Sequence, residues 1–147
     1  ALAEEMLASL IHRRAVGLAA VQVNVNIRLF VVRVDDYHRD GSVIPGKPLV
    51  YINPVIKKTS QETEIMEEGC ISIPGIRVPI ERPKEIVIEA TDLEGNRFEE
   101  ALEGYEARAR LHENDHLNGV LTIDRTPKRI RKRIEPQLRA LKKKYSS

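Results

Sequence analysis

The spacing of apolar side chains predicts two helices. Leu2, Met6 and Leu10 recur every four residues with charged side chains between them, so we expect an amphipathic helix over residues 1–14. A second helix is expected over residues 105–118, because this stretch contains no Gly or Pro and has a glycine on each side.

Between these helices the chain is predicted to form short strands and turns. Apolar or alternating runs indicate strands over residues 27–34, 49–56, 62–66, 85–91 and 97–102, the last two forming a hairpin. The polar stretch 35–47 should be a loop. Pro54 predicts an edge position or a bulge in its strand. Strands in the middle with helices at the ends indicate the α+β class.

Residues 126–147 are expected to form a basic C-terminal helical segment. It opens with Thr126-Pro127, a pair typical of a helix start, while Pro136 predicts a kink or two abutting short helices. Residues 125–147 hold ten Lys and Arg and one acid, so they carry +9 and the rest of the chain carries −7. A basic segment on an acidic body suggests contact with an anionic surface such as RNA.

Length and composition favour one compact domain, residues 1–147. No apolar run approaches the length of a membrane span, and no signal-peptide pattern is present. Cys70 is the one cysteine of the sequence, which fits a reducing compartment. Because the chain starts with Ala1 inside a predicted helix, we expect an N-terminal segment to be missing.

The strongest chemical signal is the run His112-Glu113-Asn114-Asp115-His116, an HExxH pattern. On a helix, its two histidines lie one turn apart on the same face and can bind one metal ion. Glu113 would then stand beside the ion as a proton acceptor. Hydrolytic sites usually have three protein ligands, and Cys70 is a good candidate for the third. Asp115 is expected to have an outer or structural role.

Three segments together resemble the peptide deformylase family: Gly17-Leu18-Ala19-Ala20-Val21-Gln22, Glu68-Gly69-Cys70-Ile71-Ser72, and His112-Glu113-Asn114-Asp115-His116-Leu117-Asn118-Gly119. The resemblance covers nearly the whole chain. It implies curved antiparallel sheets around a central HExxH helix, and removal of the formyl group from the N-terminal formylmethionine of nascent peptides.

The resemblance also implies a role for each site residue. Cys70, His112 and His116 would bind the metal, and Glu113 would take a proton from a metal-bound water and return it to the leaving amine. The Gln22 amide and the Ile71 backbone N–H would stabilise the oxyanion. The positions that would bind substrate are Gly17, Gly69 and Arg77.

Four departures from the family pattern are Ala15 for Gly, Val21 for Pro, Ile71 for Leu and Leu111 for Gln. None of them removes a metal ligand or the catalytic carboxylate. The family typically uses Fe²⁺ in cells, and the ligand set also suits Zn²⁺, Ni²⁺ or Co²⁺.

The alternatives are a zincin-type peptidase and a non-catalytic relative that binds metal or the ribosome. The upstream Cys ligand and the intact Glu113 and Gln22 argue against them. Expected partners are formylated nascent peptides and the ribosome, through the basic segment, with no membrane and no sequence-specific nucleic acid. The expected location is the bacterial cytoplasm, with an organelle as the alternative.

Overall fold

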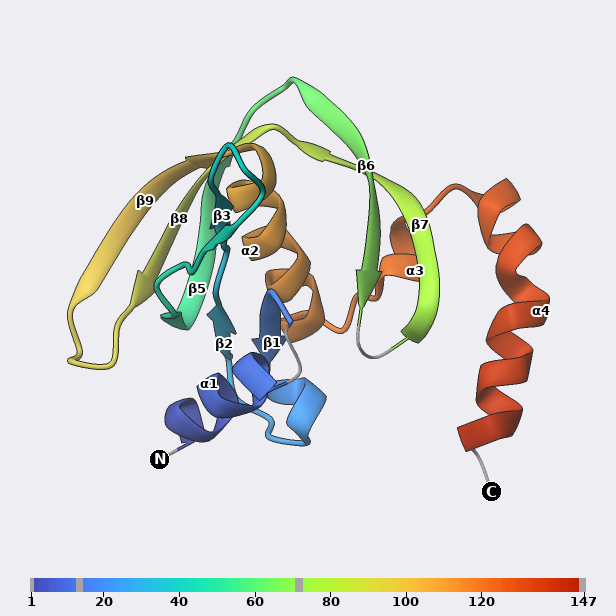
Figure 1. Cartoon of the computed structure of the whole chain (residues 1–147), viewed down its shortest axis with the longest axis horizontal. Coiled ribbons are helices and arrows are strands. Elements are labelled where there is room, and N and C mark those ends of the chain that lie inside the picture. The colour runs from blue at the N-terminus through green and yellow to red at the C-terminus, as the bar shows by residue number, and fades with distance from the viewer. Residues whose placement is uncertain (1, 13–14, 71–72, 146–147) are drawn as a thin grey trace.

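The computed structural model describes residues 2–12, 15–70 and 73–145, and it shows helices and strands arranged around one central helix (Figure 1). The elements are α1 (Leu2–His12), β1 (Gly17–Ala19), η1 (Ala20–Val23), β2 (Leu29–Val32), β3 (Asp36–Tyr37), β4 (Val43–Ile44), β5 (Leu49–Thr59), β6 (Thr63–Cys70), β7 (Ile73–Pro83), β8 (Glu85–Thr91), β9 (Arg97–Glu103), α2 (Gly104–Leu117), α3 (Thr122–Arg125) and α4 (Lys128–Tyr145). The predicted α+β class, with antiparallel sheets and a C-terminal helix, is confirmed.

Two antiparallel sheets lie on either side of α2, the helix that carries the HExxH run (Figure 1). The larger sheet has the strand order β1-β2-β5-β8-β9, and β6 pairs with β7 in a separate two-stranded sheet. Helix α2 contacts β1, β2, β8 and β9 of the larger sheet and β7 of the smaller one. This double cover explains why α2 buries charged as well as apolar side chains.

The main core fills the space between the larger sheet and α2. Phe30 of β2 stacks on Tyr51 of β5, with ring centroids 4.8 Å apart. Ile88 of β8 and Ala107 of α2 complete this core, and all four side chains are fully buried. The small Ala107 lets α2 approach the sheet closely, which brings the HExxH run near the ends of β1 and β6.

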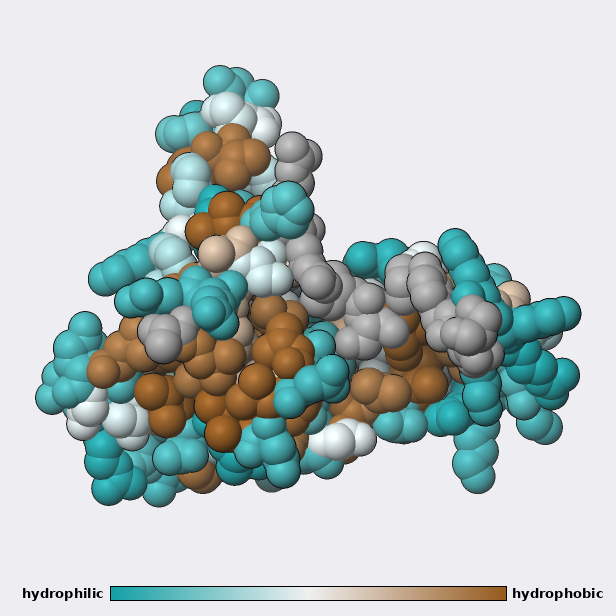
Figure 2. Space-filling model, turned by 90° about the horizontal axis from the view of Figure 1, so that it is seen from below, coloured by the Kyte–Doolittle hydropathy of each residue, from teal (hydrophilic) through white to brown (hydrophobic). Residues whose placement is uncertain are grey.

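Helix α1 covers the outer face of β1 and β2. Its Met6 and Leu10 are buried together with Leu18 and Val31, so the expected amphipathic helix is confirmed over Leu2–His12, while residues 13 and 14 lie outside the described residues. Figure 2 shows this side of the molecule from below, with apolar residues gathered towards α1 and hydrophilic residues crowded around α4. Helix α1 thereby supports the β1–η1 segment that carries Gln22.

The C-terminal helix α4 packs against the smaller sheet. Its apolar face, formed by Ile130, Ile134, Leu138 and Leu141, belongs to a cluster with Ile73, Ile76, Val78 and Ile80 of β7. Helix α4 continues through Pro136, so of the two predicted alternatives the pair of abutting short helices is wrong, while the kink stays a prediction. Apolar packing against β7 on both sides of the proline stabilises one helix across the lost hydrogen bond.

Two expectations about the strands are corrected. The predicted loop 35–47 contains a two-stranded hairpin, β3–β4, which forms a small sheet of its own. Pro54 lies in β5, a central strand, so the edge alternative is wrong and the bulge alternative holds. The bulge includes Asn53 with φ of 51°, a conformation that asparagine tolerates well. No helix in the described ranges is long and apolar enough to cross a bilayer.

Candidate active site

Cys70, His112 and His116 form a compact group of metal-ligand atoms. Cys70 ends β6, and the two histidines lie one turn apart on α2. The Sγ of Cys70 is 3.2 Å from the Nε2 of His116, which is 3.1 Å from the Nε2 of His112. All three ligand atoms lie within 4.8 Å of one another. Residues 42 positions apart in sequence are therefore brought to one point, as the sequence predicted.

The donor set fits a divalent ion of borderline softness. One thiolate and two imidazoles are ligands for Zn²⁺, Fe²⁺, Ni²⁺ and Co²⁺. Burial lowers the pKa of His112, but its hydrogen bonds to Cys70 and Glu68 outweigh burial and raise that pKa to about 10. A metal ion binds the neutral imidazole and the thiolate, so it competes with protons for these ligand atoms.

Glu113 is buried beside the ligand group. Its side chain is about 4% exposed, and its Oε1 lies 3.9 Å from the Nε2 of His112. The Oε2 is buried and makes no hydrogen bond with the residues that the structure describes. Burial raises the pKa of Glu113 to about 7. A carboxyl group with a pKa near neutrality can both accept and donate a proton, as a general base and acid must.

Gly17 of β1 makes room for this carboxyl group. A Cβ atom at position 17 would lie 2.7 Å from the Cδ and Cγ of Glu113, closer than side-chain atoms can approach. A glycine at this point therefore lets Glu113 keep its place next to His112. The requirement follows from steric contact alone, because Gly17 does not have a positive φ.

The Gln22 side chain is oriented towards the ligand group. Its Oε1 accepts a hydrogen bond from the backbone N–H of Ala19 at 2.8 Å, and its Nε2 donates to the Sγ of Cys70 at 3.5 Å. The amide nitrogen is thus directed at the site. The second predicted oxyanion donor, the backbone N–H of Ile71, lies outside the described residues.

One cavity of about 530 Å³ joins the predicted residues. Its lining includes Gly17, Gly69, Cys70, Arg77, His112 and Glu113. Arg77 is exposed at the rim, and its Nη2 donates to the backbone carbonyl of Glu67 at 3.1 Å. Apolar walls come from Ile73, Ile76 and Ala109, together with Tyr105, which the sequence did not single out. Two of the predicted ligands, Cys70 and His112, therefore share one space with the predicted base and substrate positions, and this space is large enough for a peptide end.

A buried charged group behind His112 was missed at the sequence level. Glu68 accepts from the Nδ1 of His112 at 2.9 Å and from Arg82 at 2.6 and 2.9 Å, and it also binds Arg108. Burial would raise the pKa of Glu68, but the hydrogen bonds from Arg82 and His112 lower it to about 2. The ionised carboxylate keeps a proton on Nδ1 and leaves Nε2 as the ligand atom. Asp115 binds Arg82 and Arg125 rather than a histidine.

Comparison with known proteins agrees with this geometry. The model of the polypeptide deformylase family matches residues 1–132. The peptide deformylase of Thermotoga neapolitana is 47% identical over 122 residues, which are 83% of this chain and 68% of that protein.

Two solved structures are similar over most of the chain. Arabidopsis thaliana peptide deformylase 1B, in complex with an inhibitor, superposes with a TM-score of 0.86 at 38% identity, covering 98% of this chain and 77% of that one. A class I type b peptide deformylase from Acinetobacter baumannii, with Met-Ala-Ser bound, gives 0.76 at 34% identity, covering 84% and 78%. On the family match over residues 1–132 and these relatives, the chain belongs to the polypeptide deformylase family.

Proposed function

We propose that this chain removes the formyl group from the N-terminal formylmethionine of nascent polypeptides, with the ligand group, Glu113 and Gln22 as its catalytic machinery. The observation that carries the proposal is one cavity that joins the Cys70 and His112 ligand atoms to a buried carboxyl group and to the substrate positions. The bound Met-Ala-Ser of the Acinetobacter relative fits the same reaction, because a peptide with a free N-terminal methionine is its product.

Cys70, His112 and His116 would hold one divalent ion. Such an ion supplies Lewis-acid chemistry, which acidifies water and polarises the formyl carbonyl. Fe²⁺ is the proposed ion in the cell, and Zn²⁺, Ni²⁺ and Co²⁺ fit the same donors. Glu68 accepts a hydrogen bond from the Nδ1 of His112, and this contact orients the ring so that its Nε2 can bind the ion.

Glu113 is the proposed general base and acid. Its carboxylate takes a proton from the attacking water while the water oxygen bonds to the formyl carbon. The carbon–nitrogen bond then breaks, Glu113 delivers the proton to the leaving amine, and formate is released. Burial and the raised pKa suit both transfers, and a positioned group of this kind contributes about 10²–10⁴-fold in rate.

Gln22 is the proposed side-chain donor to the oxyanion. Its Nε2 already points at the ligand group, because the N–H of Ala19 holds the amide oxygen. The Ile71 backbone N–H is proposed as the second donor, and one such donor contributes about 3–4 kcal/mol. Gly17, Gly69 and Arg77 are proposed to bind the peptide backbone, with Ile73 and Ile76 against the methionine side chain.

The test is formate release from formyl-Met-Ala-Ser by protein loaded anaerobically with Fe²⁺. Glu113→Ala should lower kcat by at least about 10²-fold, while metal content stays at one ion per chain. Glu113→Gln is the matched control, since it keeps the shape but cannot accept a proton. Full turnover in either variant would contradict the role of Glu113, and casein cleavage without formate release would favour a peptidase.

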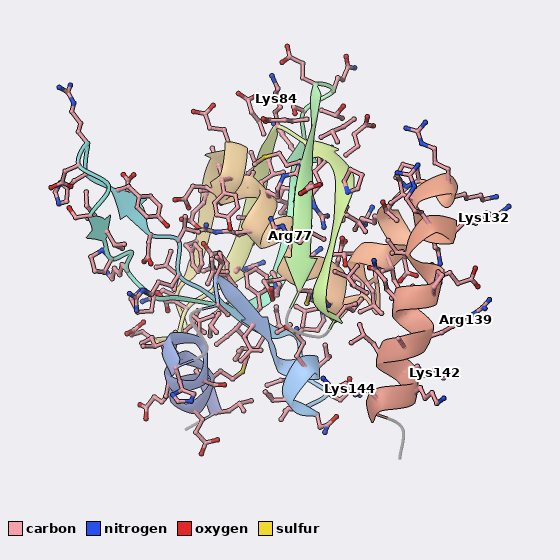
Figure 3. The ribbon with its side chains drawn as sticks, turned by 45° about the vertical axis from the view of Figure 1, so that its right-hand side comes forward. Arg77, Lys84, Lys132, Arg139, Lys142 and Lys144 are labelled. Carbon is pink, nitrogen blue, oxygen red and sulfur yellow. The ribbon has the colours of Figure 1, made fainter. Side chains whose placement is uncertain are left out.

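We further propose that residues 126–147 are a docking segment of one catalytic domain, and that its partner is the ribosome in the cytoplasm. Nine Lys and Arg residues of α4 are exposed, while its apolar face is turned to β7. Figure 3 shows Lys132, Arg139 and Lys142 projecting away from the body.

Replacing Lys132, Lys142 and Lys143 with Glu should weaken co-sedimentation with ribosomes and leave tripeptide turnover unchanged. Unchanged co-sedimentation would refute this docking.

A further inference from the structure

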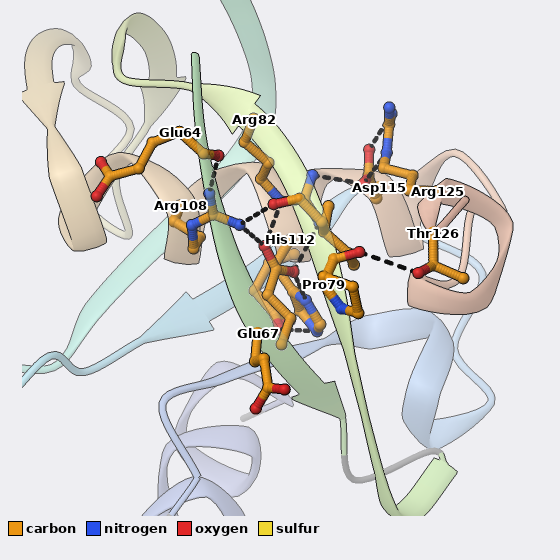
Figure 4. A network of polar contacts seen from close by, with 12 residues as sticks. Glu64, Glu67, Pro79, Arg82, Arg108, His112, Asp115, Arg125 and Thr126 are labelled. Atoms are coloured by element: carbon orange, nitrogen blue, oxygen red, sulfur yellow. Dashed lines mark hydrogen bonds and ion pairs between the residues drawn. The ribbon is translucent and has the colours of Figure 1, made fainter. Parts of the chain in front are cut away.

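We propose that Arg125 is a positioning residue for the metal site, acting on His112 through Asp115, Arg82 and Glu68. Figure 4 shows Arg125, Asp115, Arg82 and His112 within one network of polar contacts. The inference rests on the proposed role of His112 as a ligand. Arg125 touches neither metal nor substrate, so its effect must pass through the intervening ion pairs.

The inner link is the contact between Glu68 and His112. Each oxygen of Glu68 has two partners: Oε1 accepts from His112 and from the Nη2 of Arg82, both at 2.9 Å, and Oε2 accepts from the Nε of Arg82 at 2.6 Å and from Arg108. Arg108 is fixed in turn by the carbonyls of Ile80 and Glu64. The carboxylate is thus held at a defined angle, and the imidazole ring follows it.

The middle link is Arg82, which joins two carboxylates. Its Nε and Nη2 bind Glu68 as a two-pronged contact, while its Nη1 donates to the Oδ2 of Asp115 at 2.8 Å. The guanidinium group is planar and rigid, so the position of Asp115 restricts the plane in which Arg82 meets Glu68. Arg82 is 3% exposed and Asp115 is 7% exposed, so water offers little replacement for either contact.

The outer link is Arg125 at the end of α3. Its Nε and Nη2 bind the two oxygens of Asp115 at 2.5 and 2.7 Å. The next residue, Thr126, donates from its Oγ1 to the carbonyl of Pro79 at 3.0 Å, which ties the end of α3 to β7. Unlike the rest of the network, the Arg125 side chain is 44% exposed. A change here leaves the buried core intact and still reaches the network.

Removing Arg125 should change how Arg82 divides its contacts between Asp115 and Glu68. Asp115 would keep Arg82 as its cationic partner in the network, and its uncompensated charge would draw Arg82 away from Glu68. Glu68 would then hold His112 less firmly. Losing an outer contact of a metal-bound histidine typically costs about 10–100-fold in affinity or activity. Because Arg125 acts through three further ion pairs, with Asp115, Arg82 and Glu68 between it and His112, we expect a smaller effect, about 3–10-fold.

The experiment uses the full chain loaded with Co²⁺, whose visible spectrum reports on thiolate and imidazole coordination. The variants are Arg125→Ala and Arg125→Lys, and the control is Arg33→Ala. Arg33 forms a comparable ion pair, Nε to the Oδ1 of Asp35 at 3.2 Å, outside the network. The readouts are the Co²⁺ spectrum, the rate of Co²⁺ release to a chelator, and kcat and KM for formyl-Met-Ala-Ser.

Arg125→Ala should shift the Co²⁺ bands, speed Co²⁺ release by about 3–10-fold and lower kcat by a similar factor at unchanged KM. Arg125→Lys keeps the charge but not the two-pronged contact, so it should fall between Ala and the parent. Arg33→Ala should match the parent in all readouts. A purely structural Arg125 would lower Tm without moving the spectrum or the release rate, and that result would overturn the inference.

Failure of the metal site itself would look different. If the unmodified chain shows no Co²⁺–thiolate band that disappears in Cys70→Ser, the ligand assignment is wrong and the inference falls with it. If the band is present and Arg125→Ala behaves as the parent, only the role of Arg125 is refuted. Should Arg125→Ala fail to fold, Arg125→Lys decides, because parent-like Co²⁺ release in that variant would also overturn the inference.

Discussion

The buried ion network behind His112 and the exposed face of α4 contain the same kinds of charge in opposite surroundings. Glu68, Arg82, Arg108 and Asp115 are each less than 8% exposed and bind one another at fixed angles. The nine Lys and Arg residues of α4 are all exposed, and an ion pair on this face, Arg139 with Glu135, is open to water. Burial makes the difference, because water screens the second group and hardly reaches the first.

The two regions therefore serve different purposes. Charges that water cannot reach need specific partners, so the network holds the site residues in one arrangement. Losing one partner leaves a buried charge uncompensated and lowers the free energy of unfolding. Charges on α4 make few fixed contacts and create a positive field that acts over a distance. Substitutions in the network should change stability and the metal site, whereas substitutions on α4 should change association with anionic partners.

The largest expected effect is the loss of stability in Glu68→Gln. Arg82 and Arg108 would then be buried with too little negative charge around them, which costs about 3–5 kcal/mol in the free energy of unfolding. Glu135→Gln on α4 is the matched substitution and should change it by less than about 0.5 kcal/mol. Urea unfolding of both variants measures the difference. Equal losses of stability in the two variants would show that burial does not make the ion pairs of the network more important than those on α4.

An acid titration should give the next largest effect. The pKa of Glu68 is lowered to about 2 in the folded chain, against an ordinary value of 4.5, so its stabilising contribution is complete above pH 4.5 and is lost as pH falls towards 2. Urea unfolding of chelator-treated protein measures this at a series of pH values. The difference in free energy of unfolding between the parent and Glu68→Gln should shrink by about 3 kcal/mol as pH falls over this range. A gap that stays constant would mean that Glu68 titrates normally.

The smallest expected effect on the fold comes from Lys142→Ala. Its free energy of unfolding should stay within about 0.5 kcal/mol of the parent. Ribosome affinity should instead fall with rising NaCl, and the slope of log K against log salt should be shallower by about 1 in the variant, since one phosphate contact is lost. Co-sedimentation at several NaCl concentrations measures this slope. A salt-independent affinity would argue against docking through α4.

Local sequence patterns predicted much of the fold. The α1 stripe, the β8–β9 hairpin and the glycine-flanked α2 all depend on residues close in sequence, so propensity and periodicity could find them. The short β3–β4 hairpin stands where the sequence predicts a loop, because polar residues surround its strands. The sequence left open whether Pro136 kinks one helix or separates two, because proline weakens a helix locally, while the apolar packing that keeps α4 continuous lies on β7.

The sequence by itself determined the ligand types, the spacing of His112 and His116, and the family to which they belong. Only the tertiary structure decided which carboxylate holds His112, because Glu68 lies 44 residues away and meets it through the placement of β6 beside α2. The same holds for Arg82, which contacts Asp115 across 33 residues. A buried charge requires an oppositely charged partner, but burial alone does not determine which residue provides it. Strand register and helix packing make that choice, since they set which side chains share a space from which water is excluded.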